Sequence, residues 1–537
     1  MKTYEGKIVD VVKREIFSGR LHVQDGRIKK IERCQVKSKA YILPGLVNSH
    51  VHIESGMVTP RHFALESLRH GVVAAVADPH EITNVCGEAG FDFMLNEAAR
   101  SPMKIYFGVP SCVPSSPFEI GGAVLDSAAV DRLLDRDKVA ALSEVMNFSG
   151  VVNGEKELMA KIAAAKKRGK PIDGHAPLLS GETLKKYVAA GISTDHECES
   201  LEEALEKIKL GMKIQIREGS AAKNLDALAP LFKIAPENLM LCVDDLHPDD
   251  LAKGFIYKMV IRLLKADYDF FDVMRAATVN PVRHYKLDVG LLQEGDPADF
   301  IIHGDIDNFS ILKVVVDGRL VVKGKRTLIG VGRVRAINNF NRKKISAADI
   351  ALPSSSEKVR AIRAFDKALI TESEILNARL EDGFLKSNVN GDVLKIVCVN
   401  RYDFDSKPAA AFVKGFGLSK GAFASCVAHD SHNIICVGTD DDSIVKCVNK
   451  IVENKGGLAL CDGKKVFAMA LKVGGIMADV SCAKTAKKYS ELSRLAKALG
   501  CPLTAPFMTL AFMSLPVIPK LKITAKGLFD SEKMEFV

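Results

Sequence analysis

The stretch LPGLVNSHVHIESG, residues 43–56, places two histidines one residue apart at the end of an apolar run. Side chains two residues apart in a β-strand point to the same side of the sheet. His50 and His52 therefore project together, and two imidazoles in this arrangement can bind one metal ion. The stretch predicts a buried strand with a metal site at its carboxyl end.

Seven further apolar runs of similar length follow, and segments with helical spacing of apolar residues separate them. The eight runs are AYILPGLV, GVVAAVAD, KIYFGVP, VAALSEV, PIDGHA, GISTDHE, MKIQIREG and LMLCVDD. A strand followed by a helix, repeated eight times, predicts an α/β protein with a (β/α)8 barrel of the TIM type. A doubly wound sheet is the alternative, but it usually carries a glycine-rich turn after its first strand, and GxGxxG follows none of these runs.

Short alternating runs separated by glycine and charged residues flank the barrel on both sides. We expect the two flanks to pair into one small composite β domain. A charged linker and a C-terminal α+β domain follow. The predicted limits are 1–42 and 286–338 for the two parts of the small β domain, 43–285 for the barrel, 339–355 for the linker and 356–537 for the C-terminal domain.

The composition excludes several classes of function. A net charge of +9 in 537 residues is a weak bias, so we expect no nucleic-acid partner. No apolar stretch approaches the roughly 20 residues of a membrane span, and no signal peptide is visible. The 12 cysteines lack CxxC spacing and read as reduced thiols, which predicts a cytoplasmic protein with no membrane partner.

Histidines and acids gather at the ends of the predicted barrel strands, where the active site of such a barrel lies. The candidate metal ligands are His50, His52, Glu144, His175, His196 and Asp244. Further polar residues at run ends are His80, Glu81, Arg217, Glu218 and Asp245. Imidazole and carboxylate ligands suit zinc, manganese or iron, and a bridging carboxylate allows two ions. A single histidine at a strand end is more often structural, but the whole set favours a metal centre.

The order of these candidate ligands resembles that of the amidohydrolase superfamily of metal-dependent hydrolases. The segments VADPHEITNV, KIQIREGSAAKNL and VAHDSHNIICVGTDD narrow the resemblance to adenine deaminases of the bacterial and archaeal type, and it covers essentially the whole chain. Gly56, Leu178 and Val243 stand where we expect Ser, Gly and Thr. None of these departures removes a candidate ligand, but Leu178 follows His175 in a loop and could change the fit of the substrate.

The resemblance implies hydrolytic deamination of adenine to hypoxanthine and ammonia, a reaction of purine salvage, by a metal-activated hydroxide. It implies two divalent ions (Mn, Fe or Zn, with Mn favoured), a small purine base as the partner, and a homo-oligomer, with a dimer favoured. Asp244 is expected to shuttle the proton. Glu81 is favoured over Glu218 as the acid that protonates the purine ring.

The remaining candidates are assigned to substrate contacts, with alternatives. Asp245 and Glu218 are expected to touch the substrate, His80 is a substrate contact or a further metal ligand, and Arg217 either orients the substrate or pairs with an acid. His429, Asp430 and His432 fold over the barrel mouth, form a separate site, or belong to a turn in which the histidines only make hydrogen bonds. The alternative functions are another amidohydrolase that acts on a related purine or a cyclic amide, and a catalytically silent protein that kept the fold.

Overall fold

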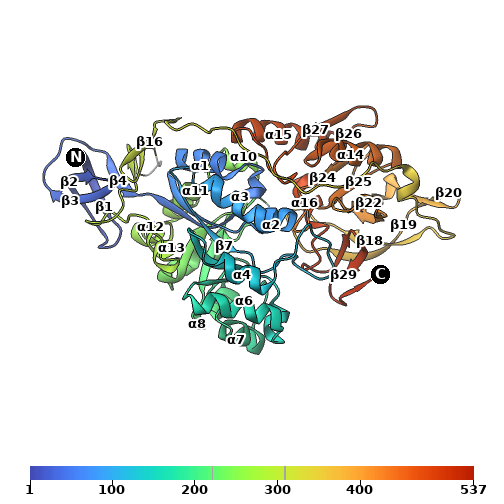
Figure 1. Ribbon diagram of the computed structural model, residues 1–537, viewed down its shortest axis with the longest axis horizontal. Helices are drawn as coiled ribbons and strands as arrows, with labels where there is room; N and C mark the ends of the chain where they lie inside the picture. Colours follow the sequence, from blue (N-terminus) through green and yellow to red (C-terminus); the bar gives the residue numbers. More distant parts are fainter. Residues whose placement is uncertain (221, 307–309) are drawn as a thin grey trace.

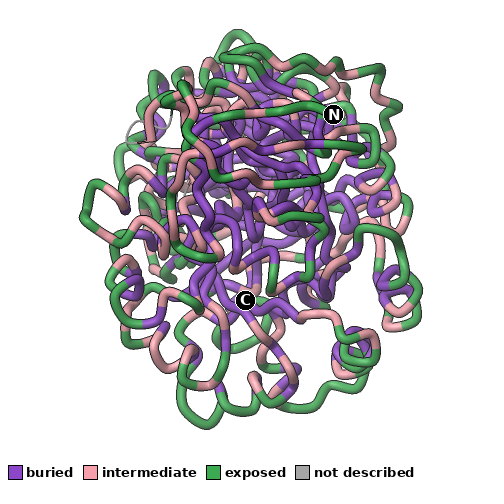
Figure 2. Tube along the Cα trace, turned by 90° about the vertical axis from the view of Figure 1, so that its left-hand side faces the viewer, coloured by how far each residue is buried: buried purple, intermediate pink, exposed green. Residues whose placement is uncertain are grey.

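The computed structural model describes residues 1–220, 222–306 and 310–537. Its parts follow one another along the long axis of the molecule: an N-terminal sheet, a central barrel and a C-terminal α+β region (Figure 1). Buried segments run through the interior and exposed segments lie toward the rim when the molecule is viewed from the N-terminal end (Figure 2). Among the described residues, every helix is too short or too polar to cross a membrane.

All eight predicted runs form strands of a barrel, so the predicted fold class is confirmed. The strands are β5 (Leu46–His52), β6 (Val72–Ala77), β7 (Lys104–Val109), β8 (Val139–Val145), β9 (Ile172–Gly174), β10 (Thr194–Asp195), β11 (Lys213–Arg217) and β12 (Leu239–Cys242), with β13 (Asp244–Asp245) continuing the last. Parallel pairing joins β5 through β9, joins β10 through β12, and joins β13 to β5. Two backbone hydrogen bonds link these groups into a ring: Ser193 N donates to Ile172 O at 2.8 Å, and Val243 N donates to His50 O at 3.3 Å.

Helices on the outside of the barrel cover its strands. The longer ones are α1 (Pro60–Arg69), α2 (His80–Cys86), α3 (Glu88–Ala98), α4 (Ser127–Leu133), α6 (Lys156–Lys167), α7 (Gly181–Ala189), α8 (Leu201–Lys209), α11 (Ile256–Lys265), α12 (Phe270–Ala276) and α13 (Val279–His284). Shorter turns of helix are η1 (Ile53–Gly56), α5 (Phe148–Val152), α9 (Leu225–Leu228), η2 (Ala229–Lys233), η3 (Pro236–Asn238) and α10 (Pro248–Leu251). In α11, Ile256, Met259, Val260 and Leu263 are buried, the spacing of one apolar helix face. Several helices begin at a side-chain cap; Asp126, for example, accepts from Ala129 N.

The N-terminal sheet contains strands from both flanks of the barrel, in the order β17-β16-β15-β14-β4-β1-β2-β3. These strands are β1 (Lys2–Asp10), β2 (Glu15–Gln24), β3 (Arg27–Arg33), β4 (Tyr41–Pro44), β14 (Phe300–His303), β15 (Ile311–Val316), β16 (Arg319–Lys323) and β17 (Arg326–Thr327). The chain passes from β4 into β5 through Gly45, where a Cβ atom would lie 2.2 Å from a methyl group of Val73. Only glycine allows the two sheets to approach this closely. The predicted limit after residue 42 falls inside β4, and the other domain limits remain predictions.

The C-terminal region is built on an eight-stranded sheet in the order β19-β18-β23-β22-β25-β24-β26-β27. Its strands are β18 (Lys358–Arg363), β19 (Glu372–Asn377), β22 (Leu394–Val399), β23 (Ala409–Lys414), β24 (Ala422–Ser425), β25 (Ile434–Gly438), β26 (Leu458–Cys461) and β27 (Val466–Met469). The other elements are η4 (Ala347–Ile350), β20 (Arg379–Glu381), β21 (Phe384–Lys386), η5 (Val389–Gly391), α14 (Asp441–Asn454), α15 (Cys482–Ala498), α16 (Pro506–Phe512), β28 (Leu521–Thr524), β29 (Gly527–Asp530) and β30 (Glu535–Phe536). Ile444, Cys447 and Ile451 of α14 pack on one face of this sheet.

The C-terminal region is fixed to the barrel by direct contacts. Cys482 at the start of α15 contacts Pro248 O at 3.5 Å, and Tyr489 packs edge-on against His247. The fully buried guanidinium of Arg401 donates to Asn338 Oδ1 at 2.7 Å and to Asn339 O at 3.1 Å. The start of the predicted linker is therefore held in place rather than extended into solvent.

Candidate metal centre and active site

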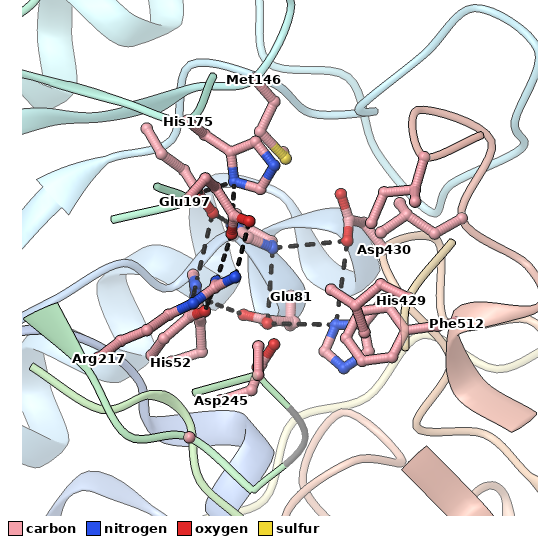
Figure 3. A pocket seen from close by; sticks show the side chains of 18 residues that line it. His52, Glu81, Met146, His175, Glu197, Arg217, Asp245, His429, Asp430 and Phe512 are labelled. Carbon is pink, nitrogen blue, oxygen red and sulfur yellow. Dashed lines mark hydrogen bonds and ion pairs between the residues drawn. The ribbon is translucent and has the colours of Figure 1, made fainter. Parts of the chain in front are cut away.

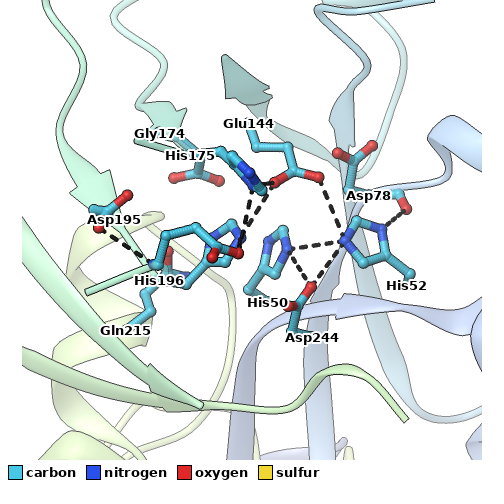
Figure 4. A network of polar contacts seen from close by, with 12 residues as sticks. His50, His52, Asp78, Glu144, Gly174, His175, Asp195, His196, Gln215 and Asp244 are labelled. Atoms are coloured by element: carbon cyan, nitrogen blue, oxygen red, sulfur yellow. Dashed lines mark hydrogen bonds and ion pairs between the residues drawn. The ribbon is translucent and has the colours of Figure 1, made fainter. Parts of the chain in front are cut away.

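The six candidate metal ligands lie together at the carboxyl ends of the barrel strands (Figure 4). His50 and His52 lie on the same side of β5, with their Nε2 atoms 3.2 Å apart. Asp244 Oδ1 lies 3.1 Å from His52 Nε2 and 3.5 Å from His50 Nε2. The spacing of the opening stretch thus brings two imidazoles and the carboxylate after the eighth strand to one point.

Glu144 lies between this group and the remaining two histidines. Its Oε1 atom is 3.4 Å from His52 Nε2, while its Oε2 atom is 2.9 Å from His175 Nδ1 and 3.2 Å from His196 Nε2. One carboxylate oxygen therefore faces His52, and the other faces His175 and His196.

The unmet bonding capacity of these side chains fits a divalent cation. The Nδ1 atom of buried His196 has no hydrogen-bond partner, although buried polar groups are normally paired. The ring of His196 is stacked on that of His50 at 4.3 Å. Imidazole nitrogens and carboxylate oxygens at these separations are a donor set that manganese, iron or zinc accepts.

Charge around the cluster keeps its carboxylates ionised. Burial by itself raises the pKa of Glu144, but the histidines His175 and His196 outweigh it and hold the pKa well below its usual range. Burial also opposes ionisation of Asp244, and the guanidinium of Arg217 lowers the pKa of this carboxyl well below its usual range. Both acids are therefore available as ligands or as proton acceptors.

Arg217 at the end of β11 is held by two buried acids. Its Nη1 atom donates to Asp244 Oδ2 at 2.5 Å, and its Nη2 atom donates to Glu197 Oε2 at 2.7 Å. Glu197 Oε1 also lies 3.5 Å from His196 Nε2. Of the two roles expected for Arg217, the geometry favours pairing with acids. The sequence analysis missed Glu197, whose only signal was its position directly after His196.

The segment Asp78–Glu81 forms the next part of the site. His80 Nδ1 lies 3.1 Å from Asp78 Oδ2 and 3.4 Å from Glu144 Oε1. Glu81 Oε2 lies 3.5 Å from His52 Nδ1, and neither carboxylate oxygen of this buried side chain has a hydrogen-bond partner. Asp245 lies nearby and accepts a hydrogen bond from Ser55 Oγ.

The structure corrects the expectation for Glu218. This residue does not line the pocket described below. Its carboxylate pairs with Arg262 Nη1 of α11 at 2.6 Å, toward the outside of the barrel. Because Arg217 and Glu218 are adjacent in an extended segment, they point to opposite sides.

The metal cluster opens into a pocket at the barrel mouth, whose empty space, counted together with the open solvent at its entrance, is about 500 Å³. The barrel contributes His52, His80, Glu81, Glu144, Met146, His175, Glu197, Arg217, Gly219, Ala222, Asp244 and Asp245 to its wall. The C-terminal region contributes Leu369, His429, Asp430, Phe512, Leu515 and Ile518 (Figure 3). His429 and Asp430 therefore lie over the barrel mouth, the first of the alternatives given above. His432 is buried behind them, where its Nδ1 atom accepts from Ala428 N at 3.2 Å.

Leu178 lies outside the pocket, with an exposed side chain. Its backbone has a φ of +60°, in the left-handed region that glycine adopts without strain. Its N–H donates to Glu203 Oε1 at 2.9 Å. The positive φ at this position explains why a glycine is expected there. The leucine found instead affects the loop after His175 and not the pocket wall.

Comparisons with known proteins agree with this architecture. Residues 41–321 match the model of the amidohydrolase family, and residues 368–535 match that of the adenine deaminase C-terminal domain. Adenine deaminases of Methanosarcina barkeri and Salinibacter ruber are 50% and 48% identical, over 100% and 99% of this chain and 99% and 98% of their own length. The chain belongs to the adenine deaminase family. Residues of both the amidohydrolase segment and the adenine deaminase C-terminal segment line the pocket, which therefore lies between these two parts of the chain.

Proposed function

We propose that the chain catalyses the hydrolytic deamination of adenine to hypoxanthine and ammonia. The observation that carries the proposal is the metal-ligand cluster at the bottom of the pocket, in a chain that is 50% identical to an adenine deaminase over its whole length. The pocket is lined by carboxylates, imidazoles and a guanidinium from several barrel strands. Its buried acids supply the proton donors and acceptors that the reaction needs.

We further propose two divalent ions, with manganese as the first choice, held by His50, His52, Glu144, His175, His196 and Asp244. Glu144 would be the ligand shared by the two groups of histidines, because one of its oxygens faces His52 and the other faces His175 and His196. Bound there, such ions lower the pKa of water and supply the nucleophile at neutral pH.

Two carboxylates are assigned to proton transfer. Asp244 is ionised and borders both the metal cluster and the pocket, so it accepts the proton of the attacking water and passes it to the leaving amine. Glu81 is assigned to the protonation of a ring nitrogen. Its buried carboxylate oxygens lack hydrogen-bond partners and border the same space.

The remaining barrel residues position these groups and the substrate. Asp245 and His80 are assigned to contacts with the purine edge, since both line the pocket. Arg217 is assigned to holding Asp244 in place, because its terminal nitrogens are already engaged by acids. Glu218 has no role in the proposal.

The pocket between the barrel and the C-terminal region, with its buried acids and imidazoles, supports a free purine base as the substrate. We propose that the protein acts in purine salvage in the cytoplasm, as a homodimer and without nucleic-acid or membrane partners. The 12 cysteines, all unpaired in the structure, support the cytoplasmic location.

The test is the loss of adenine absorbance by manganese-loaded protein, with ammonia release measured alongside. The double variant His50→Ala/His52→Ala is the control. We expect turnover by the native protein and none by the variant, which also fails to retain metal. If the native protein binds metal in stoichiometric amount but leaves adenine unchanged, the substrate assignment is wrong, and related purines and cyclic amides are assayed next.

A further inference from the structure

The C-terminal wall of the pocket contains one ionised group with unmet bonding capacity. Asp430 lies between β24 and β25, and 2% of its surface is exposed. Its Oδ2 atom is buried without a hydrogen-bond partner. Its Oδ1 atom has only long contacts, to His80 Nε2 at 3.7 Å and His429 Nδ1 at 3.9 Å, and no lysine or arginine of the described chain pairs with it.

The loop that carries Asp430 is fixed on several sides. Ser514 Oγ donates to His429 O at 3.2 Å, Tyr402 OH donates to Ser431 O at 2.6 Å, and Asn433 Nδ2 donates to Ile120 O at 2.9 Å. The carboxylate therefore cannot move out to water without breaking these bonds. A buried acceptor held in this way costs free energy unless a ligand supplies the missing donor.

The position of Asp430 relative to the metal cluster indicates which part of a substrate it meets. The ring of His80 separates the two: its Nδ1 atom is 3.4 Å from Glu144 Oε1, and its Nε2 atom is 3.7 Å from Asp430 Oδ1. Asp430 thus stands one imidazole ring beyond the cluster (Figure 3). In a purine, N9 lies farther from C6 than N7 does, so a purine whose C6 atom faces the cluster can place N9 on the far side of the pocket, where this wall lies.

We propose that Asp430 is a specificity-determining residue that accepts a hydrogen bond from the imidazole N–H of the purine and thereby selects the free base over N9-substituted purines. The inference rests on the proposed deamination of adenine. A free purine carries one N–H on its five-membered ring, whereas an N9-substituted purine carries none and leaves the carboxylate unpaired. A site built to bond such a group rejects the analogue that lacks it by about 10⁴-fold.

The test compares adenine with 9-methyladenine as substrates of the native protein and of Asp430→Ala. The alanine also removes bulk, so the methyl group has space. We expect kcat/KM for adenine to fall about 10- to 100-fold in the variant, while that for 9-methyladenine is unchanged or rises. Asp442→Asn, at an exposed acid of α14, is the matched control and leaves both values unchanged. Metal content and melting temperature are measured for each protein.

A binding measurement separates failure of this inference from failure of the proposed function. Titration calorimetry measures the affinities of hypoxanthine and 9-methylhypoxanthine, and so tests the hydrogen bond to Asp430 without turnover. Asp430→Ala should weaken only the binding of hypoxanthine. An equal loss for both compounds, or no loss for either, shows that Asp430 has a structural role only and overturns the inference while deamination stands. If the native protein neither deaminates adenine nor binds hypoxanthine, the proposed function and the inference are both wrong.

Discussion

The two walls of the pocket are built on different principles. The barrel wall is a dense set of imidazoles and carboxylates, each within about one hydrogen-bond length of the next. The C-terminal wall is mostly apolar, with Leu369, Leu515, Ile518 and the ring of Phe512 around a single carboxylate, Asp430. In the proposed function, the barrel wall holds the groups that carry out the chemistry, while the C-terminal wall excludes water and shapes the space. Substitutions on the two walls should therefore affect different kinetic constants.

The largest effect is expected on the barrel wall, for Asp244→Asn. The amide keeps the volume of the side chain but cannot accept the proton, so kcat should fall by about 10²- to 10⁴-fold with a small change in KM. Steady-state assays with adenine and metal analysis measure this. Asp226→Asn, at an exposed acid of α9, is the control. Near-native kcat in Asp244→Asn would remove the residue from the proposed proton shuttle.

A large loss of stability is expected for Arg217→Met. This substitution leaves Glu197 and Asp244 buried without their cation, and breaking a buried ion pair in this way costs about 3–5 kcal/mol. Urea unfolding of the metal-free protein measures the difference. Arg262→Met removes a half-exposed guanidinium from its pairs with Glu218 and Asp226 and should cost less than about 1 kcal/mol. Equal losses in the two variants would contradict the role assigned to Arg217.

The barrel wall could be predicted from sequence because one rule generates it. Alternation along a strand brings His50 and His52 to the same side, and parallel strands bring their carboxyl ends to one edge. The rule does not always hold beyond the end of a strand. Glu197 was missed because β10 stops at Asp195, so the residues after it no longer alternate and both His196 and Glu197 face the cluster. Glu218 was misread because alternation, which holds there, turns it away from Arg217.

The C-terminal wall could not be predicted from sequence; the sequence only raised the possibility that His429 and Asp430 lie over the barrel mouth. Its residues come from three separate segments, around Leu369, His429 and Phe512, and no local period connects them. Only the packing of the C-terminal sheet on the barrel brings them together. The motif AHDSHN drew attention to His429 and Asp430, but the pattern alone left open whether they reach the barrel.

A smaller effect, dependent on pH, is expected beneath the C-terminal wall at Lys522. Its buried ammonium donates to the carbonyls of Leu369 and Phe512 at 2.8 and 3.0 Å, and burial lowers the pKa of this lysine to about 7. Between pH 7 and its ordinary pKa the unfolded chain binds more protons than the native state, so stability rises with pH in this range.

The measurement is urea unfolding at pH 7 and pH 9 for the native protein, Lys522→Met and the half-exposed control Lys520→Met. Relative to Lys522→Met, the native protein should gain about 2 kcal/mol between the two pH values. Relative to Lys520→Met, it should gain nothing. Parallel pH dependence of the native protein and Lys522→Met would show that this lysine keeps its ordinary pKa.

The smallest effect is expected for Phe512→Leu on the C-terminal wall. The phenyl ring lies flat on His429, with centroids 4.7 Å apart and an interplanar angle of 8°. Leucine keeps the site apolar but loses the aromatic stack, which is worth about 0.5–1.5 kcal/mol. KM for adenine should therefore rise about threefold to tenfold, while kcat stays near its native value because the ring lies on the wall opposite Asp244. Phe384→Leu, at a partly exposed ring of β21, should change neither constant. A fall in kcat at constant KM would mean that the C-terminal wall takes part in the chemistry, and the division between the two walls would not hold.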